Sequence, residues 1–180
     1  MTRPVVTFCL ALSATCALIA CESSSEPVDS GYESPGADKI IISGEHTLTS
    51  DGIRSAIVYF DTLYMYDDSA KMHLRGMRIE LFAKDGHPTG IVTADRGVYD
   101  ERTQLMVGQG DTRLVTIEGD RIIETEEMFY DPNTRQLWSD SLTYMETGGS
   151  AYEGDSFRAD DAFNNVTVSP LRSVARRGGI

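Results

Sequence analysis

The feature that most constrains the fold is a short motif that returns at nearly constant spacing. An aromatic residue followed by Asp opens a turn at Tyr66, Tyr99 and Tyr130, 33 and then 31 residues apart, with a weaker fourth copy at Phe157. The motif lies between runs rich in Val, Ile, Thr and Tyr, a composition typical of β-strands separated by turns. Repeats of this length imply stacked strand pairs. The sequence therefore predicts an all-β fold built from repeated antiparallel hairpins.

The N-terminal segment is typical of an exported lipoprotein. Arg3 precedes an apolar stretch, residues 5–20, that is too short and too small in side-chain volume for a membrane span. It ends in Leu18-Ile19-Ala20-Cys21, the pattern cut by bacterial lipoprotein signal peptidase. We expect residues 1–20 to be a signal peptide and the Cys21 thiol to carry a diacylglycerol. An ordinary secretory signal is the alternative. Under either interpretation the chain is exported. The cleavage pattern at residues 18–21, called a lipobox, predicts a periplasmic protein anchored in the inner or the outer membrane.

The remaining sequence suggests one folded domain on a tether. Residues 22–38 have almost no apolar side chain to bury, which indicates a disordered segment. We therefore divide the chain into a lipidated Cys and tether over 21–39, a domain over 40–170, and a basic C-terminal tail over 171–180. Cys9 and Cys16 fall in the signal peptide, so the domain itself has no thiol.

Charge and motif content exclude several functions. The formal net charge is -12, which repels phosphates and argues against nucleic-acid binding. The three histidines, His46, His73 and His87, are scattered without metal-ligand spacing. Adjacent carboxylates such as Asp160 and Asp161 fit solvated turn residues better than an acid-base pair. We predict no metal, no cofactor and no enzymatic activity.

The order of strands and turns resembles the LptC-type lipopolysaccharide-export proteins of the OstA-like β-jellyroll family. The resemblance covers residues 47–168 and rests on four segments in series, none of them diagnostic alone: FAKDGHPT at 82–89, VTADRGVY at 92–99, GQGD at 108–111 and IETEE at 123–127. It implies an open, V-shaped β-jellyroll whose apolar interior receives the acyl chains of lipopolysaccharide. It also implies two partners, an inner-membrane ABC transporter complex that loads the lipid and a periplasmic OstA-like bridge protein that receives it. Typical members keep a transmembrane anchor, and the lipobox of this chain departs from that.

Strand alternation sends every second side chain inward, so the apolar strand residues are candidates for both core and lipid groove. The predicted groove residues are Val98, Leu105, Val107, Leu114, Ile123, Phe129 and Leu137.

The last hairpin is the predicted docking edge for the bridge partner. Its residues are Gly154, Phe157, Val166 and Val168, and Gly154 would let a neighbouring backbone approach closely. Relief of a turn is the alternative role for Gly154. A structural envelope lipoprotein that acts as a scaffold without lipid transfer is the alternative function.

Overall fold

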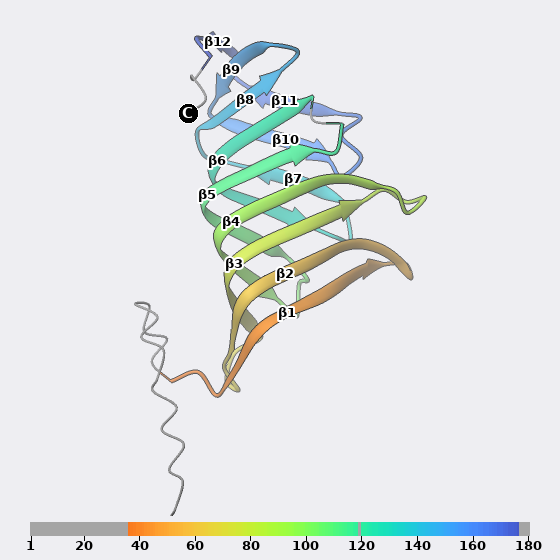
Figure 1. The fold of residues 1–180 in the computed structure, drawn as a ribbon, viewed down its shortest axis with the longest axis vertical. Coiled ribbons are helices and arrows are strands. Elements are labelled where there is room, and N and C mark those ends of the chain that lie inside the picture. The colour runs from red at the N-terminus through yellow and green to blue at the C-terminus, as the bar shows by residue number, and fades with distance from the viewer. Residues whose placement is uncertain (1–35, 119, 177–180) are drawn as a thin grey trace, which may run out of the picture. The chain divides into compact units, whose positions relative to one another are not determined.

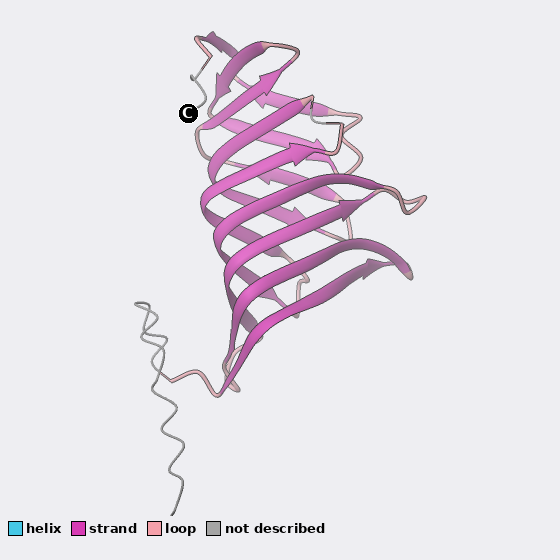
Figure 2. Ribbon diagram, viewed as in Figure 1, coloured by secondary structure: helices cyan, strands magenta, loops and turns pink. Residues whose placement is uncertain are grey.

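Alternating strand-forming runs and turns produce one large antiparallel sheet. The computed structural model describes residues 36–118 and 120–176, so the predicted signal peptide, Cys21 and most of the tether lie outside the described residues. The described residues form strands and turns without a helix (Figure 1, Figure 2). The strands are β1 Lys39–Ser50, β2 Ile53–Met65, β3 Lys71–Phe82, β4 Pro88–Asp100, β5 Met106–Thr116, β6 Arg121–Asp131, β7 Gln136–Ser139, β8 Thr143–Thr147, β9 Ser150–Gly154, β10 Ser156–Asp160, β11 Val166–Ser169 and β12 Arg172–Val174.

The aspartates of the repeated motif end strands and fasten the turns that follow them. Asp100 Oδ1 accepts hydrogen bonds of 3.0 Å from the backbone N–H groups of Arg102 and Thr103. These bonds, led by the one from Thr103, hold the pKa of Asp100 below its usual value. Asp131 accepts in the same way from the N–H of Asn133 at 2.9 Å. The hairpin repeat predicted from the sequence is therefore confirmed, with the motif aspartates as local caps.

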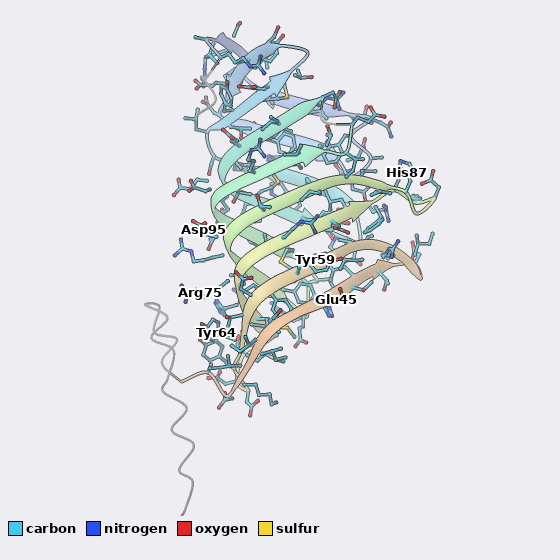
Figure 3. All side chains as sticks on the ribbon, in the orientation of Figure 1. Glu45, Tyr59, Tyr64, Arg75, His87 and Asp95 are labelled. Carbon is cyan, nitrogen blue, oxygen red and sulfur yellow. The ribbon has the colours of Figure 1, made fainter. Side chains whose placement is uncertain are left out.

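A line of irregular residues bends the long strands near their middles. The ladder between β4 and β5 shifts register between Thr93 and Arg96, and positive φ angles occur at Gly76 (60°) and Gly110 (74°). A Cβ at Gly76 would lie 2.0 Å from the Asp61 carboxylate of β2, and one at Gly110 would lie 2.8 Å from that of Asp95. Glycine is thus required twice along the bend, by conformation and by space. Figure 3 labels Asp95 on this side of the sheet and His87 at the opposite, free ends of the strands.

Because the long strands bend, each of β1 to β6 contributes to two layers (Figure 1). Layer A contains the C-terminal halves of β1, β3 and β5, the N-terminal halves of β2, β4 and β6, and then β8, β9 and β12. Layer B contains the other halves, followed by β7, β10 and β11. The sheet divides at β6, whose residues 121–125 pair with β8 while residues 129–131 pair with β7.

The core fills the space between the two layers. A cross-strand row of buried aliphatic residues runs along the inner face of layer A: Val58, Ile79, Val92, Leu114 and Ile123. A matching row lines layer B: Tyr99, Met106, Tyr130, Leu137 and Ala159. The predicted fold class, an all-β jellyroll with an open antiparallel sheet, is confirmed. Its strands begin at Lys39 and continue to Val174, so the tail predicted from residue 171 contributes a short strand.

Candidate functional site

An apolar cavity of about 280 Å³ lies between the layers at the β1 end of the sheet. Layer A supplies Phe60 to its wall, and layer B supplies Leu63, Met72 and Tyr99. Burial raises the pKa of the Tyr99 hydroxyl, and the nearby carboxylates of Glu101 and Asp100 add to the effect. The cavity is an interior surface that the described side chains leave unfilled.

Alternation along β2 explains why Phe60 reaches this cavity. Tyr59 faces outward, where the Arg78 guanidinium lies 5.4 Å from its ring centre. Phe60, its neighbour, faces inward and lies against Gly44 of β1, where a Cβ would be only 2.7 Å from the Phe60 ring. Glycine at position 44 therefore lets the aromatic ring reach the edge strand.

The cavity opens toward the most exposed strand of the sheet. β1 pairs with β2 on one side, and no described strand pairs with its other side. Ile40 and Ile42 are 55% and 70% exposed, which is unusual for large aliphatic residues. The ring of His46 on the same strand lies 5.6 Å from that of Tyr99. Ile41, which lies between Ile40 and Ile42 in the sequence, lines the cavity and is 45% exposed, so an unpaired backbone and an exposed aliphatic side chain border the cavity.

The side of the interior away from the bend is closed by contacts between the two layers. Four hydrogen bonds join layer A to layer B on the side away from the bend, and each ends on a backbone carbonyl. They run from Tyr130 Oη to Ser55 O at 3.4 Å, from Thr89 Oγ1 to Asp161 O at 2.5 Å, from Arg121 Nη1 to Phe163 O at 2.9 Å, and from Arg135 Nη2 to Phe82 O.

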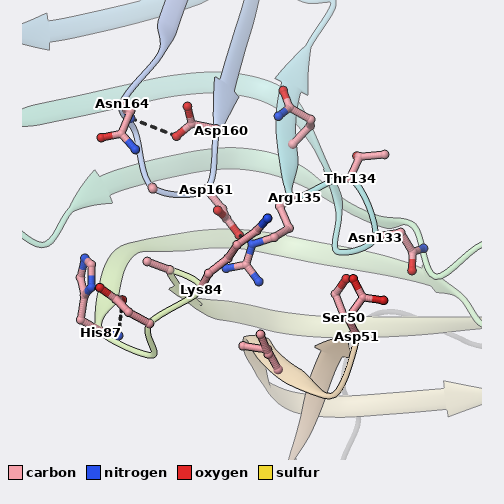
Figure 4. A pocket seen from close by; sticks show the side chains of 15 residues that line it. Ser50, Asp51, Lys84, His87, Asn133, Thr134, Arg135, Asp160, Asp161 and Asn164 are labelled. Atoms are coloured by element: carbon pink, nitrogen blue, oxygen red, sulfur yellow. Dashed lines mark hydrogen bonds and ion pairs between the residues drawn. The ribbon is translucent and has the colours of Figure 1, made fainter.

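A buried ion pair between Arg135 and Asp161 helps to hold the two layers together on this side. Arg135 Nε and Asp161 Oδ2 are 2.8 Å apart, and their side chains are 9% and 6% exposed. They lie at a polar cleft of about 630 Å³ to which Lys84 and Asp160 also contribute, and Figure 4 shows Arg135 and Asp161 pointing toward each other. Burial raises the pKa of Asp161 to about 6 although the Arg135 charge opposes the shift. The expectation that Asp161 is a solvated turn residue was wrong, because the loop after β10 folds inward.

The predicted groove residues fall into two groups. Leu114, Ile123 and Leu137 are fully buried in the core. The other four are half-buried. Val98, Val107 and Phe129 are cross-strand neighbours in layer B, and they lie on the outer face because Tyr99 and Met106 occupy the inner face. Leu105 precedes β5. Phe129 stacks on Trp138 with ring centres 5.2 Å apart. Lipid contact at these positions stays a prediction. None of the seven residues lines the cavity, whose wall comes mainly from β1, β2 and β3, with Tyr99 of β4 and Met106 of β5.

The residues of the predicted docking edge do not all lie at an edge of the sheet. β10 lies between β7 and β11, so Phe157 is in an internal strand and fully buried, and we correct its assignment to an edge. β11, which carries Val166 and Val168, ends its layer. A Cβ at Gly154 would lie 2.4 Å from Val168 Cγ1 and 2.9 Å from the backbone N of Ser169. The close backbone approach expected at Gly154 is therefore made by this chain itself.

Two absences concern only the described ranges, 36–118 and 120–176. No group of three or more His, Cys, Asp or Glu side chains there is placed to hold a metal ion. No helix within these ranges is long and apolar enough to cross a membrane.

Comparison with known proteins finds a family model and solved structures that are similar to the chain. Residues 11–169 match the family model described as "Lipopolysaccharide-assembly, LptC-related". Among solved structures, the chain is similar to LptH, the LptA homologous periplasmic component of the conserved lipopolysaccharide transport device from Pseudomonas aeruginosa. The identity is 10%, the match covers 68% of this chain and 95% of that chain, and the TM-score is 0.49. Nothing among the curated proteins matches the chain.

Proposed function

The chain belongs to the LptC family of lipopolysaccharide-assembly proteins, and we propose that it transfers lipopolysaccharide by binding acyl chains in the cavity at the β1 end. Family membership gives the chain a role in lipopolysaccharide transport. The binding site, the direction of transfer and the membrane anchor belong to the proposal.

The apolar cavity between the layers is the observation that carries the proposal. Each methylene group moved from water into such a space contributes about 0.8 kcal/mol. A volume of about 280 Å³ lies just below the usual range of ligand sites, which begins at about 300 Å³. The cavity in this conformation therefore fits the ends of acyl chains rather than a whole lipid.

The edges of the sheet support the proposed partners. β1 offers an unpaired backbone next to the cavity, so a strand of an inner-membrane ABC transporter complex that adds to β1 would deliver lipid directly into it. β11 ends layer B at the other side of the sheet and is the edge we assign to a periplasmic OstA-like bridge protein. The Cys21 lipid would hold the domain at a membrane in the periplasm through a tether of residues 22–38.

A photo-crosslinking experiment tests the binding site with matched neighbours. A benzoylphenylalanine at Phe60 or Met72 faces the cavity, whereas the same group at Tyr59 or His73 lies on the outer face of the same strands. We expect purified lipopolysaccharide to be captured at Phe60 and Met72 and not at Tyr59 and His73. Equal capture at the inner and outer positions would remove the support for an interior site.

A scaffold without lipid transfer is the second candidate, and the filled C-terminal half favours it. Leu137, Phe157 and Leu114 are completely buried there, as in a closed structural core. Absence of capture at both inner positions, in a protein that still associates with its envelope partners, would favour the scaffold.

A further inference from the structure

Residues 160–165, which connect β10 to β11, form a strap across the free side of the interior. The strap begins with Asp160, whose carboxylate accepts hydrogen bonds of 3.0 Å from the N–H groups of Asn164 and Asn165. The Asp161 N–H donates to the Arg135 carbonyl at 3.0 Å. The strap is therefore an ordered turn attached to layer B.

Phe163 connects the strap to layer A. Its ring is buried within the core cluster, and a Cβ at Gly90 of β4 would lie 2.8 Å from the ring. Its carbonyl accepts from Arg121 of β6, and its φ is 56°, a left-handed conformation that is costly for a bulky residue. The surrounding contacts therefore hold Phe163 in place against its own backbone preference.

The position of this ring matters because β4 is the fourth strand from the β1 edge. The cavity is lined by β1 to β5, and the filled part of the interior continues along the layers toward β9 and β11. An acyl chain that extends from the cavity into this filled part must displace buried side chains. Among the buried residues of the core cluster in the described ranges, Phe163 is the one that lies on a connecting segment and not in a strand.

Resting on the proposed function, we infer that Phe163 limits how far acyl chains enter the interior, and that the strap must move for them to reach its C-terminal half. Phe163 is thus a positioning residue for the lipid. The Arg135–Asp161 ion pair and the Thr89–Asp161 bond hold the strap closed.

The test places photo-reactive groups at both ends of the interior. Phe60 reports the cavity, and Tyr152 of β9, which pairs with Met145 and packs on the core, reports the C-terminal half. Two variants displace the ring in different ways: Phe163→Ala removes it, and Gly90→Ala pushes against it. Asp85→Ala, on the exposed turn between β3 and β4, is the control.

In the unaltered chain we expect lipopolysaccharide to be captured at Phe60 and only weakly at Tyr152. Both ring variants should raise capture at Tyr152 several-fold and leave capture at Phe60 unchanged, while Asp85→Ala changes neither. Strong capture at Tyr152 in the unaltered chain, or no increase in either folded variant, would overturn the inference.

Hydrogen exchange on the unaltered, lipid-free chain keeps the inference testable if a variant fails to fold or if Phe60 captures no lipid. The amides of Asp161 and Phe163 should exchange through a local opening that leaves the amides in the middle of β3 and β4 protected. Exchange of the strap only together with global unfolding would refute a movable strap. Failure of capture at Phe60 alone would count against the proposed function instead.

Discussion

The two ends of this sheet are built from the same hairpin repeat and yet have opposite character. At the β1 end the strands are long, the edge is unpaired and an apolar cavity remains between the layers. At the C-terminal end the strands shorten to three to five residues, and the loops between them fold inward to join the layers. The difference shows that the repeat determines the stacking of strands, while the connecting loops decide whether the interior is open or closed.

The largest expected effect comes from breaking the ion pair at the closed end. Asp161→Ala leaves the buried Arg135 charge without its partner, and we expect it to lower the free energy of unfolding by about 3 to 5 kcal/mol. Asp140→Ala breaks the exposed pair with Arg158 and should cost less than about 1 kcal/mol. Chemical denaturation of both variants measures the difference. Similar losses for the two would mean that the closed end does not depend on its buried pair.

Truncating one leucine at each end tests the packing directly. Leu137→Ala at the closed end removes a fully buried side chain, and a loss toward the upper part of the usual range of about 2 to 5 kcal/mol is expected. Leu63→Ala at the open end borders the existing cavity and should fall toward the lower part of that range, because fewer atoms surround the side chain. A greater loss for Leu63 would show that the β1 end is the better packed of the two.

The raised pKa of Asp161 predicts a specific pH dependence at the closed end. Between the unfolded value near 4 and the folded value of about 6, the folded chain binds more protons than the unfolded chain. The contribution of Asp161 to the free energy of unfolding is therefore fully present at low pH and is lost as the pH rises through this window, by at most about 3 kcal/mol.

Thermal or chemical unfolding of the unaltered chain and of Asp161→Asn across this window isolates the effect of the carboxyl group. The stability of the unaltered chain relative to Asp161→Asn should decrease from pH 4 to pH 7. An increase over the same range would show that Arg135 keeps the carboxylate ionised.

The smallest effect is expected at Gly154. The 2.4 Å approach of a Cβ to Val168 Cγ1 means that Gly154→Arg must displace β11, at a cost of about 1 to 3 kcal/mol. Ser150→Arg, exposed at the start of the same strand, is the matched control. Melting curves alongside a pull-down with the bridge partner separate the two roles of Gly154. A folded, equally stable Gly154→Arg that loses binding would restore the docking role expected from the sequence.

The strands and turns could be predicted from local sequence. Which strand residues face the interior could not, because the bend changes the alternation of the strands. The turn at Tyr99-Asp100 follows from side chains that bond to their own backbone, so the sequence alone locates it. Along β4, buried Val92 and Ala94 are even-numbered, but after the bend the buried residues are Gly97 and Tyr99. An irregularity of one residue exchanges the two faces of a strand. Uninterrupted alternation would have placed Val98 inside, and the same exchange turns Phe129 outward.

Long-range contacts account for what the sequence could not indicate about the closed end. Asp161 follows Asp160 in an acidic turn and has no local feature that distinguishes a buried from a solvated carboxylate. Its burial depends on Arg135, 26 positions earlier in the sequence, and on Thr89, which lies further away still. The cavity is equally non-local, because Phe60 and Tyr99 line the same space although they come from different strands and different layers.

The four bonds that join the layers all end on main-chain carbonyls, of Ser55, Phe82, Asp161 and Phe163. A carbonyl is supplied by whichever amino acid occupies the position, so mutation of an acceptor residue leaves the bonding atom in place. For these four bonds, only the donor side chains are therefore specified by the sequence, whereas the Arg135–Asp161 ion pair depends on both of its side chains. During divergence, a homologue could loosen or tighten its interior by exchanging a single donor, without any change to the strands that it joins.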